Sequence, residues 1–140
     1  MTIEELNTFN AQEYKELAEL MNILDSSCHL TEEQLEETVT APASHLYVMR
    51  HEGHIIGCYT LGLFHSPTGR KASVEDVVVH TDYQGQHLGK LLIGHAINQL
   101  RQWAPIHVQL TSRPHRVAAN ALYKSVGFLP KDTNVYVMNL

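Results

Sequence analysis

The feature that most limits how this chain can fold is an apolar run that leads through a glycine-marked turn directly into a helical pattern. Residues 71–79 place Val74 and Val78 on one face of an expected strand, and Val77 and Val79 on the other. A strand with apolar side chains on both faces is typical of the centre of a sheet that is covered on both sides. We therefore expect helices to flank the sheet.

The turn that follows this strand has the composition of an anion-binding loop. A glycine-rich turn between a strand and a helix presents free backbone N–H groups together with the positive end of the helix dipole, and this arrangement binds phosphate. Taken alone, the turn also fits an ordinary connector. Its residues are Tyr83, Gln84, Gly85, Gln86, His87, Leu88, Gly89 and Lys90.

Two common nucleotide-binding loops do not fit this turn. A Walker A loop needs four residues between its glycines and Ser or Thr after its lysine, but three residues separate Gly85 from Gly89, and Leu91 follows Lys90. The dinucleotide pattern G-x-G-x-x-G is absent, and the strands before the turn are expected to form a hairpin and not a βαβ unit. Both of these classes are disfavoured.

The remaining patterns predict one domain over residues 1–140. With 140 residues and 44% hydrophobic content, the chain is large enough for one core and too small for two. Four helices are expected, from the Asn10 cap to near Asp25, from Thr31 to before Pro42, from Leu88 to Trp103, and from Val117 to Val126. Strands are expected over residues 45–51, 54–64, 71–79, 106–111 and about 133–139.

Charge and cysteine usage exclude several classes of protein. A net charge of −5 and a pI near 6.0 argue against a nucleic-acid partner, which would require clustered Lys and Arg. The charge is uneven, with −9 over residues 1–40 and +4 over residues 41–140, so the second part is better suited to an anion. Cys28 and Cys58 form no C-x-x-C pair, and Glu4 and Glu5 stand where a signal peptide would be basic. We expect a cytoplasmic protein with no membrane partner.

The ten histidines do not predict a metal site. The nearest grouping, His51-Glu52-x-His54, falls across an expected turn, and no cysteine joins it.

Three motifs in this chain resemble the GNAT superfamily of acetyl-CoA-dependent N-acetyltransferases. Residues 84–89 match the loop pattern Q/R-x-x-G-x-G/A, and residues 118–128 match the closing pattern A-x-x-x-Y-x-x-x-G-F. Residues 75–92 are especially similar to glucosamine-6-phosphate N-acetyltransferases, in the cofactor half only. The chain departs from the family at His87, where glycine is usual, and at Arg116, where asparagine is usual.

The resemblance implies an α/β (α+β) fold with a mixed, mostly antiparallel sheet and helices on both faces. It implies acetyl-CoA as cosubstrate, with the pantetheine arm along the exposed edge of a strand and the pyrophosphate on the loop. The unusual His87 matters only if its position needs a positive φ. The implied cofactor-binding residues are Val77, Val78, Val79, Gln84, Gly85, Gln86, His87, Leu88, Gly89, Lys90 and Asn120.

Glu75 and Tyr123 are the candidate catalytic residues. Desolvation of Glu75 in an apolar strand would raise its pKa toward the range of a useful base, although a solvated carboxylate paired with Arg70 or Lys71 fits the sequence equally. A water-relayed base elsewhere is also possible. By resemblance, Tyr123 would donate to the thioester sulfur, and its alternative is a tyrosine that packs in the core.

The leading hypothesis is transfer of an acetyl group to the amine of a small molecule in a ternary complex. Two alternatives stay open: a non-catalytic acyl-CoA sensor, and an acetyltransferase of protein N-termini or lysines. Arg113, His115 and Arg116 fit a cofactor phosphate, an acidic acceptor or a solvated helix start equally well. The resemblance also implies a homodimer, to which a strand around residues 134–138 would contribute by edge pairing.

Overall fold

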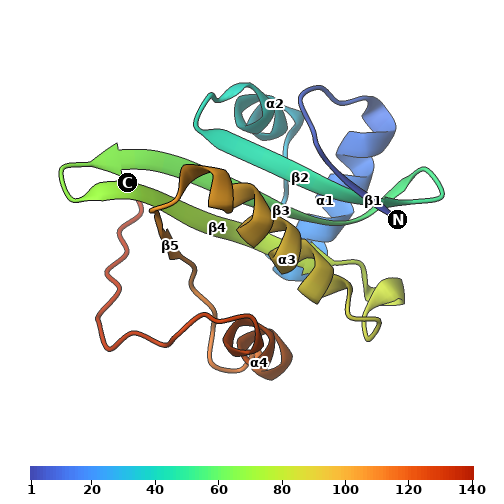
Figure 1. Ribbon diagram of the computed structural model, residues 1–140. Helices are drawn as coiled ribbons and strands as arrows, with labels where there is room; N and C mark the ends of the chain where they lie inside the picture. The colour runs from blue at the N-terminus through green and yellow to red at the C-terminus, as the bar shows by residue number, and fades with distance from the viewer.

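The computed structural model describes residues 1–140 as one five-stranded sheet with helices on both faces (Figure 1). The strands are β1 (Thr2–Glu5), β2 (Ser44–His51), β3 (His54–Ser66), β4 (Gly69–Val79) and β5 (His107–Gln109). The helices are α1 (Ala11–Leu24), α2 (Glu32–Thr40), α3 (Leu88–Leu100) and α4 (Val117–Ser125), with short 3-10 turns at Thr81–Tyr83 and Arg101–Trp103.

The strand order in the sheet is the order of the strands in the sequence. Neighbouring strands from β1 to β4 are antiparallel, and only β5 lies parallel to its neighbour β4. The pairing between β4 and β5 is short, because it joins only Lys71–Ser73 to His107–Gln109. The mixed, mostly antiparallel sheet confirms the predicted fold class.

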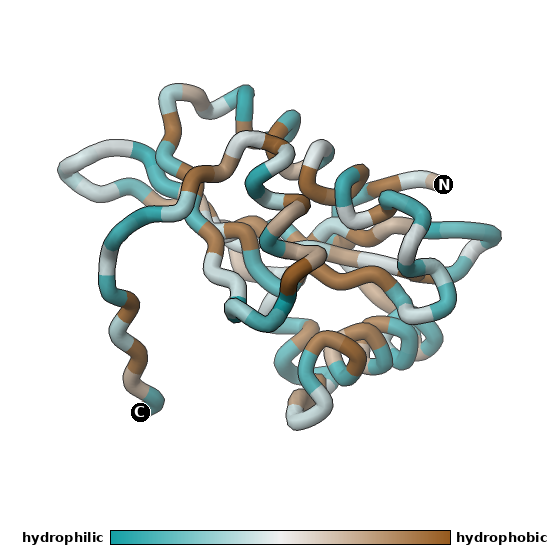
Figure 2. The backbone as a smooth tube through the Cα atoms, turned by 90° about the horizontal axis from the view of Figure 1, so that it is seen from below, coloured by the Kyte–Doolittle hydropathy of each residue, from teal (hydrophilic) through white to brown (hydrophobic).

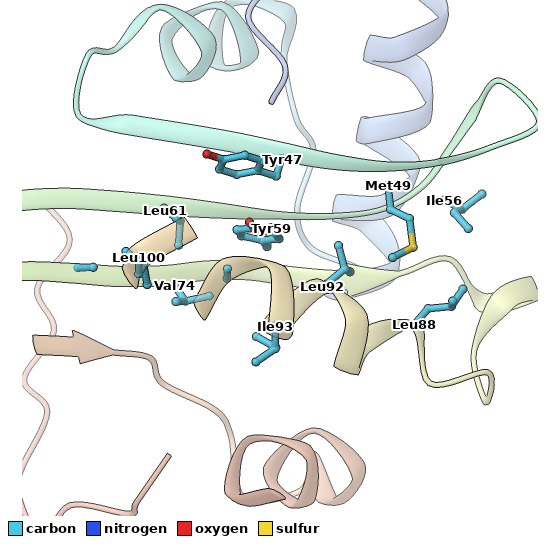
Figure 3. Packing of buried hydrophobic residues seen from close by; sticks show 12 residues of the cluster. Tyr47, Met49, Ile56, Tyr59, Leu61, Val74, Leu88, Leu92, Ile93 and Leu100 are labelled. Atoms are coloured by element: carbon cyan, nitrogen blue, oxygen red, sulfur yellow. The ribbon is translucent and has the colours of Figure 1, made fainter. Parts of the chain in front are cut away.

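Two groups of buried side chains hold the helices against the two faces of the sheet. One group joins Leu17 and Leu20 of α1 and Leu35 of α2 to the face that carries Val48 and Cys58. The other group joins α3 to the opposite face. Figure 3 shows Leu92 and Leu100 of α3 beside Tyr59, Leu61 and Val74 of the sheet, and Leu88 at the other end of the helix on the side of Ile56. The core is therefore two layers separated by the sheet.

The first two helices begin where the sequence predicts. In α1, the Asn10 side chain accepts a hydrogen bond from the Glu13 N–H, and the Glu13 carboxylate accepts one from the Asn10 N–H. Thr31 and Gln34 form the same reciprocal pair at the start of α2. Each pair satisfies two N–H groups that would otherwise lack partners, which fixes the start of the helix.

A bulge in β4 overturns the predicted assignment of side chains to its faces. Tyr59 of β3 lies opposite both Asp76 and Val77, and Asp76 has a left-handed φ of 53°. The extra residue shifts the alternation by one position. As a result Val77 and Val79 pack with Val74 on the α3 side, and Val78 alone packs on the α1 side.

The two ends of the chain differ from the sequence expectation. Residues 2–5 form β1, an edge strand that was not predicted because its short, acidic sequence has little apolar alternation. The strand expected over residues 133–139 is absent, because no neighbouring strand lies beside these residues to form a ladder. Figure 2 shows the last residues extending away from the body of the protein.

None of the helices combines the length and the apolar character that crossing a membrane requires.

Candidate functional site

The start of α3 presents unpartnered N–H groups toward a cleft. His87 is the N-cap residue and makes no side-chain capping bond. The first hydrogen bond of the helix runs from the Leu91 N–H to the His87 carbonyl over 3.3 Å, so the N–H groups of Leu88, Gly89 and Lys90 precede it. These donors lie at the positive end of the helix dipole, which favours an anion.

His87 adopts the conformation that the usual glycine would adopt at lower cost. Its φ is 61° and its ψ is 21°, in the left-handed region. The position therefore does need a positive φ, and a histidine in place of the usual glycine is expected to strain the backbone of the loop there. The nearby Gly85 also has a positive φ, of 82°. Gly89 has a different role, because a Cβ there would lie 3.3 Å from a Leu122 methyl carbon, so glycine allows α4 to approach α3 closely.

A cleft of about 1020 Å³ lies between this loop and α4. The loop side of the cleft contains seven of the predicted cofactor-binding residues, namely Val79, Gln84, Gly85, His87, Leu88, Gly89 and Lys90. The opposite side is formed by residues 115–119, 121, 122 and 125 of α4 and the turn before it, and the end of α1 adds Ile23 and Leu24. The predicted residues Val77, Val78, Gln86 and Asn120 do not line it.

The edge of β4 next to the cleft has no neighbouring strand. Since β5 pairs only with Lys71–Ser73, the backbone from Val74 to Val79 is open on that side. An open strand edge can hydrogen-bond an extended ligand as another strand would. The Gln84 side-chain amide donates to the Val79 carbonyl at 3.0 Å, which anchors the loop to the end of this strand.

Arg116 joins two walls of the cleft. Its guanidinium donates to the carbonyl of Leu24, the last residue of α1, at 2.6 Å. No basic residue lies in the last turn of α1, so Arg116 supplies a cation at the negative end of that helix from a distant part of the chain. We call this interaction the Arg116 clasp. It connects the turn before α4 to the end of α1.

Asn120 holds the turn before α4 and does not face the cleft. Its side-chain amide donates to the carbonyls of Arg113 and Arg116, at 3.0 and 2.8 Å. The side-chain amide of Asn120 thus positions Arg116. A role for Asn120 in contacting a cofactor remains a prediction.

Glu75 and Asp76 lie at the β4 bulge. Glu75 is exposed and accepts a hydrogen bond from the Ser73 hydroxyl, and it makes no ion pair with Arg70 or Lys71. Part of Asp76 reaches solvent, but the protein atoms packed around its carboxyl raise its pKa, and the charge of Glu75 raises it further. The bulge therefore brings two carboxyls together, and the pKa of Asp76 is moved in the direction that suits a base.

Tyr123 belongs to α4, and its ring packs against that of Phe128 in an edge-to-face arrangement with ring centroids 6.2 Å apart. Burial raises the pKa of Tyr123, and the nearby charge of Arg116 lowers it by a smaller amount. The hydroxyl is therefore protonated at neutral pH and can donate a hydrogen bond. It does not line the cleft in this conformation.

Comparison with known proteins decides the family. The family model described as "Acetyltransferase (GNAT) family" matches residues 10–128, which include the cleft, the loop and the β4 bulge. The chain belongs to the GNAT acetyltransferase family.

Individual relatives of this GNAT chain match shorter stretches. It is 41% identical over 70 residues to the uncharacterized N-acetyltransferase ycf52 of Pyropia yezoensis, covering 50% of this chain and 38% of that protein. It is 38% identical over 58 residues to the [ribosomal protein bS18]-alanine N-acetyltransferase of Escherichia coli K12, covering 41% of this chain and 39% of that protein. The chain thus spans about two fifths of the length of the curated relatives that it matches.

Solved structures extend the likeness to the whole fold. The aminoglycoside acetyltransferase meta-AAC0020, from an uncultured soil metagenomic sample, has a TM-score of 0.83 at 19% identity, covering 99% of this chain and 95% of that one. At this level of identity, the likeness shows the GNAT fold alone.

Sequence reasoning missed three features of the GNAT cleft. Ile23 and Leu24 become part of the wall only through tertiary packing, and no local signal marks them. The Arg116 clasp had a signal, because arginine stands where the family usually has asparagine, but its partner lies 92 residues away. Asp76 stands next to Glu75 in the sequence, but only the bulge shows that its carboxyl is packed against protein atoms that raise its pKa.

Proposed function

We propose that this protein is an acetyl-CoA-dependent N-acetyltransferase that transfers an acetyl group to the primary amine of a small molecule. One observation carries the proposal most strongly. The uncapped start of α3 and Val79, where the open edge of β4 ends, border the same cleft, so phosphates on the loop and an extended arm that continues along β4 fit one ligand. Family membership supports acetyl-CoA as that ligand.

The site favours direct attack by the amine in a ternary complex. The amine nitrogen bonds to the thioester carbonyl carbon, the carbon–sulfur bond breaks, and the products are an amide and the free thiol. Backbone N–H groups on the open β4 edge would stabilise the developing oxyanion. This route needs no protein nucleophile, and Cys58 is unsuited to be one, because burial raises the pKa of its thiol to about 12.

Proton transfer is assigned to the β4 bulge and to α4. Glu75 or Asp76 would accept the proton of the attacking amine, directly or through water, and the raised pKa of Asp76 brings that carboxyl closer to the ideal for a base. Tyr123 would donate a hydrogen bond to the departing sulfur. Because Tyr123 packs beside Phe128, this role requires its hydroxyl to reach the cleft once acetyl-CoA is bound.

The acidic first part of the chain supports a cationic acceptor only in part. Several of its carboxylates are already paired within the body: Glu4 and Glu13 with Arg50, Glu5 with His45, Glu16 with His54, and Glu19 with His80. The four glutamates of α2 make no ion pair. The charge that would attract an amine is therefore carried by α2, by Asp25 next to the cleft residue Leu24, and by the β4 bulge.

A protein substrate is the second candidate. It is favoured by the similarity to the [ribosomal protein bS18]-alanine N-acetyltransferase of Escherichia coli, which by its name acts on a protein. The chemistry at the amine would be the same, because a protein N-terminus is also a primary amine.

The decisive experiment measures binding and turnover separately. Thermal shift with CoA and acetyl-CoA should show stabilisation, because a ligand that binds the folded state raises its stability by mass action. Release of CoA would then be followed with panels of polyamines, aminoglycoside-like amines, amino sugars, phospho-sugars and N-terminal peptides. Absence of any stabilisation by CoA would contradict the proposal, and preference for the peptides would select the second candidate.

Two substitutions distinguish an enzyme from a sensor of acyl-CoA. Glu75→Gln and Tyr123→Phe should leave CoA binding nearly unchanged and lower the rate of acetyl transfer. Asp76→Asn, tested alongside, decides which carboxyl of the bulge accepts the proton. A protein that binds CoA but has no measurable turnover with any amine would be a sensor.

A further inference from the structure

One face of the sheet is left uncovered where β3, β4 and β5 lie side by side. Leu61, Val74 and Val108 pack on the α3 side, so the residues before and after each of them point to the opposite side. On that side α1 and α2 cover β2 and the first part of β3, and the joined ends of β3 and β4 extend beyond both helices (Figure 1). We call this uncovered surface the open face. Its residues are Thr60, Gly62 and Phe64 of β3, Lys71, Ser73 and Glu75 of β4, and His107 and Gln109 of β5.

The open face carries opposite charges at its two ends. Phe64, Lys71 and His107 lie opposite one another on three neighbouring strands and form one end. Glu75 forms the other end, and Asp76 of the bulge follows it. A strand advances about 3.3 Å per residue, so Lys71 and Glu75 are roughly 13 Å apart along β4. Lys71 makes no ion pair, and its neighbour Phe64 is 56% exposed. The Lys71 ammonium is therefore available to an anion.

The surface between the two ends is flat. Gly62 of β3, Ser73 of β4 and Gln109 of β5 form one row across the sheet. Only the Cβ of Ser73 would lie within 4 Å of a Cβ at Gly62, at 3.9 Å, so space is left above the glycine. The Ser73 hydroxyl donates a hydrogen bond to Glu75. No large side chain of β3 or β4 therefore separates Lys71 from Glu75, and an elongated molecule can lie along β4.

We propose that the open face binds the acceptor, and that the acceptor is an amine with a carboxylate or phosphate at its far end. The amine lies at the β4 bulge, and the anionic group contacts the Lys71 ammonium and the His107 imidazole. The proposal rests on the acetyl transfer proposed above, to which it adds a class of acceptor and two residues that select it.

The pairing of the strands connects the open face to the reacting atoms. Since β5 pairs with β4 only as far as Ser73, the edge of β4 is open from Val74 to Val79. An acetyl-bearing arm that runs along this edge from Val79 reaches the bulge from one direction. An acceptor that lies along β4 from Lys71 reaches the bulge from the other direction. The two ligands of a ternary complex thus meet at the bulge without competing for the same surface.

The charges on the open face also orient the acceptor. The carboxylates at the bulge attract an ammonium group, and Lys71 attracts an anion, so a molecule with both charges is held with its nitrogen at the bulge. A diamine of the same length would place its second ammonium group beside Lys71 and be repelled. The open face therefore discriminates by the group at the far end of the acceptor.

The test measures kcat/KM from CoA release with four series of amines of increasing length. The series are ω-amino carboxylates, ω-aminoalkyl phosphates, plain alkylamines and α,ω-diamines. The two anionic series should react best, the alkylamines less well and the diamines worst. Because the lysine stem is flexible, the optimum should fall where about 7 to 13 Å separates the nitrogen from the anion. The faster of the two anionic series identifies the anion.

Substitutions at Lys71 test the contact directly. Lys71→Gln should lower the ratio of kcat/KM for the best anionic amine to that for the matched alkylamine by about threefold to tenfold. Lys71→Glu should reverse the preference, so that the diamine reacts better than the anionic amine. Lys131→Gln removes the same charge from an exposed residue outside the open face and should leave the ratio unchanged. Thermal shift with CoA establishes that each variant is folded and keeps its cofactor site.

Two results would overturn the proposal and leave acetyl transfer standing. Alkylamines that react as well as the anionic amines at every length would show that no group recognises an anion. A preference for anionic amines that persists in Lys71→Glu would place the anion on another surface. Failure of the proposed function is different, because the wild-type protein would then neither be stabilised by CoA nor acetylate any of the four series.

Discussion

The part of the chain up to Leu100 and the part after it are built in different ways. Every buried residue of the protein lies at or before Leu100, and all of them except Leu6 lie on the sheet, α1, α2 or α3. After Leu100, β5 has three residues, α4 buries none of its side chains completely, and Val117 on α4 is 74% exposed. The cleft lies where these two parts meet, so one of its walls is rigidly packed and the other is held by few contacts.

This difference indicates how the protein can hold a large ligand. The loop and the start of α3 rest on a packed core, which keeps the N–H donors in fixed positions. The α4 wall is tied by the Gly89–Leu122 approach, the Tyr123–Phe128 contact and the Arg116 clasp. We expect α4 to move more easily than the loop when a ligand enters.

The largest expected effect is a loss of stability in the packed part of the chain, up to Leu100. Leu92→Ala removes a fully buried side chain from α3 and should lower the free energy of unfolding by about 2–5 kcal/mol. The matched Leu122→Ala on α4 should lower it by only about 1 kcal/mol, because Leu122 is partly exposed. Urea unfolding measures both. Equal losses would show that the two parts are packed alike.

The second prediction concerns the tie between the two parts. Arg116→Met keeps an apolar stem but leaves the Leu24 carbonyl without its charged donor, which should lower stability by about 2 kcal/mol. It should also speed amide exchange in α4 and weaken CoA binding. Arg113→Met removes the same charge from an exposed residue and serves as the control. Similar effects of both variants would point to charge and not to the clasp.

The third prediction tests the loop at the junction. His87→Gly relieves a left-handed conformation that costs about 1–2 kcal/mol, and the greater chain entropy of glycine offsets part of the gain. We expect a net stabilisation of up to about 1 kcal/mol by urea unfolding, with CoA affinity maintained. His87→Ala keeps the Cβ and should bring no such gain. A destabilised glycine variant would show that the imidazole makes a stabilising contact.

The smallest expected effect appears in the pH dependence of stability. The pKa of Asp76 is raised in the folded state, so the folded protein holds this proton more tightly than the unfolded chain does. Stability from this group is present below the unfolded pKa of about 3.9 and is lost as pH rises through the folded pKa. An asparagine cannot ionise, so the Asp76→Asn variant does not lose stability in this way. The stability of the variant relative to wild type should therefore increase with pH in this range.

Unfolding at a series of pH values measures that difference. Glu75→Gln is the control, because it removes the second cause of the raised pKa and should weaken the pH dependence without abolishing it. A difference between wild type and Asp76→Asn that stays constant with pH would contradict the assignment.

Local signals predicted most of the packed part of the fold. The Asn10 and Thr31 capping pairs, the hairpin of β2 and β3, and the start of α3 at Leu88 all lie where spacing and turn residues place them. These features depend on neighbours in the sequence, which is why they could be read without a structure. The strand at residues 2–5 depends on pairing with β2 and was missed for that reason.

The candidate site was predicted only where its residues are continuous in the sequence. Val79 and most of residues 84–90 line the cleft, and their contact with a cofactor stays a prediction. The contacts from Leu24 to Arg116 and from Gly89 to Leu122 join distant segments, and spacing along the chain carries no record of them. The prediction of a strand at residues 133–139 was wrong for the opposite reason. The local pattern is typical of a strand, but no neighbouring strand lies beside these residues to form the ladder that a strand requires.

The bulge at Asp76 reverses the alternation of side chains part-way along β4. Up to Glu75, even-numbered residues face α3, and from Val77 onward odd-numbered residues do. If Asp76 had an ordinary extended conformation instead, one alternation would run through the whole strand and turn Val77 and Val79 toward α1 and Val78 toward α3. Deletion of Asp76 would remove the extra residue and leave the three valines on their present sides. The left-handed backbone of one residue thus sets which side of the sheet the last three valines face, and a deletion of one residue elsewhere in β4 should be far less tolerated than deletion of Asp76 itself.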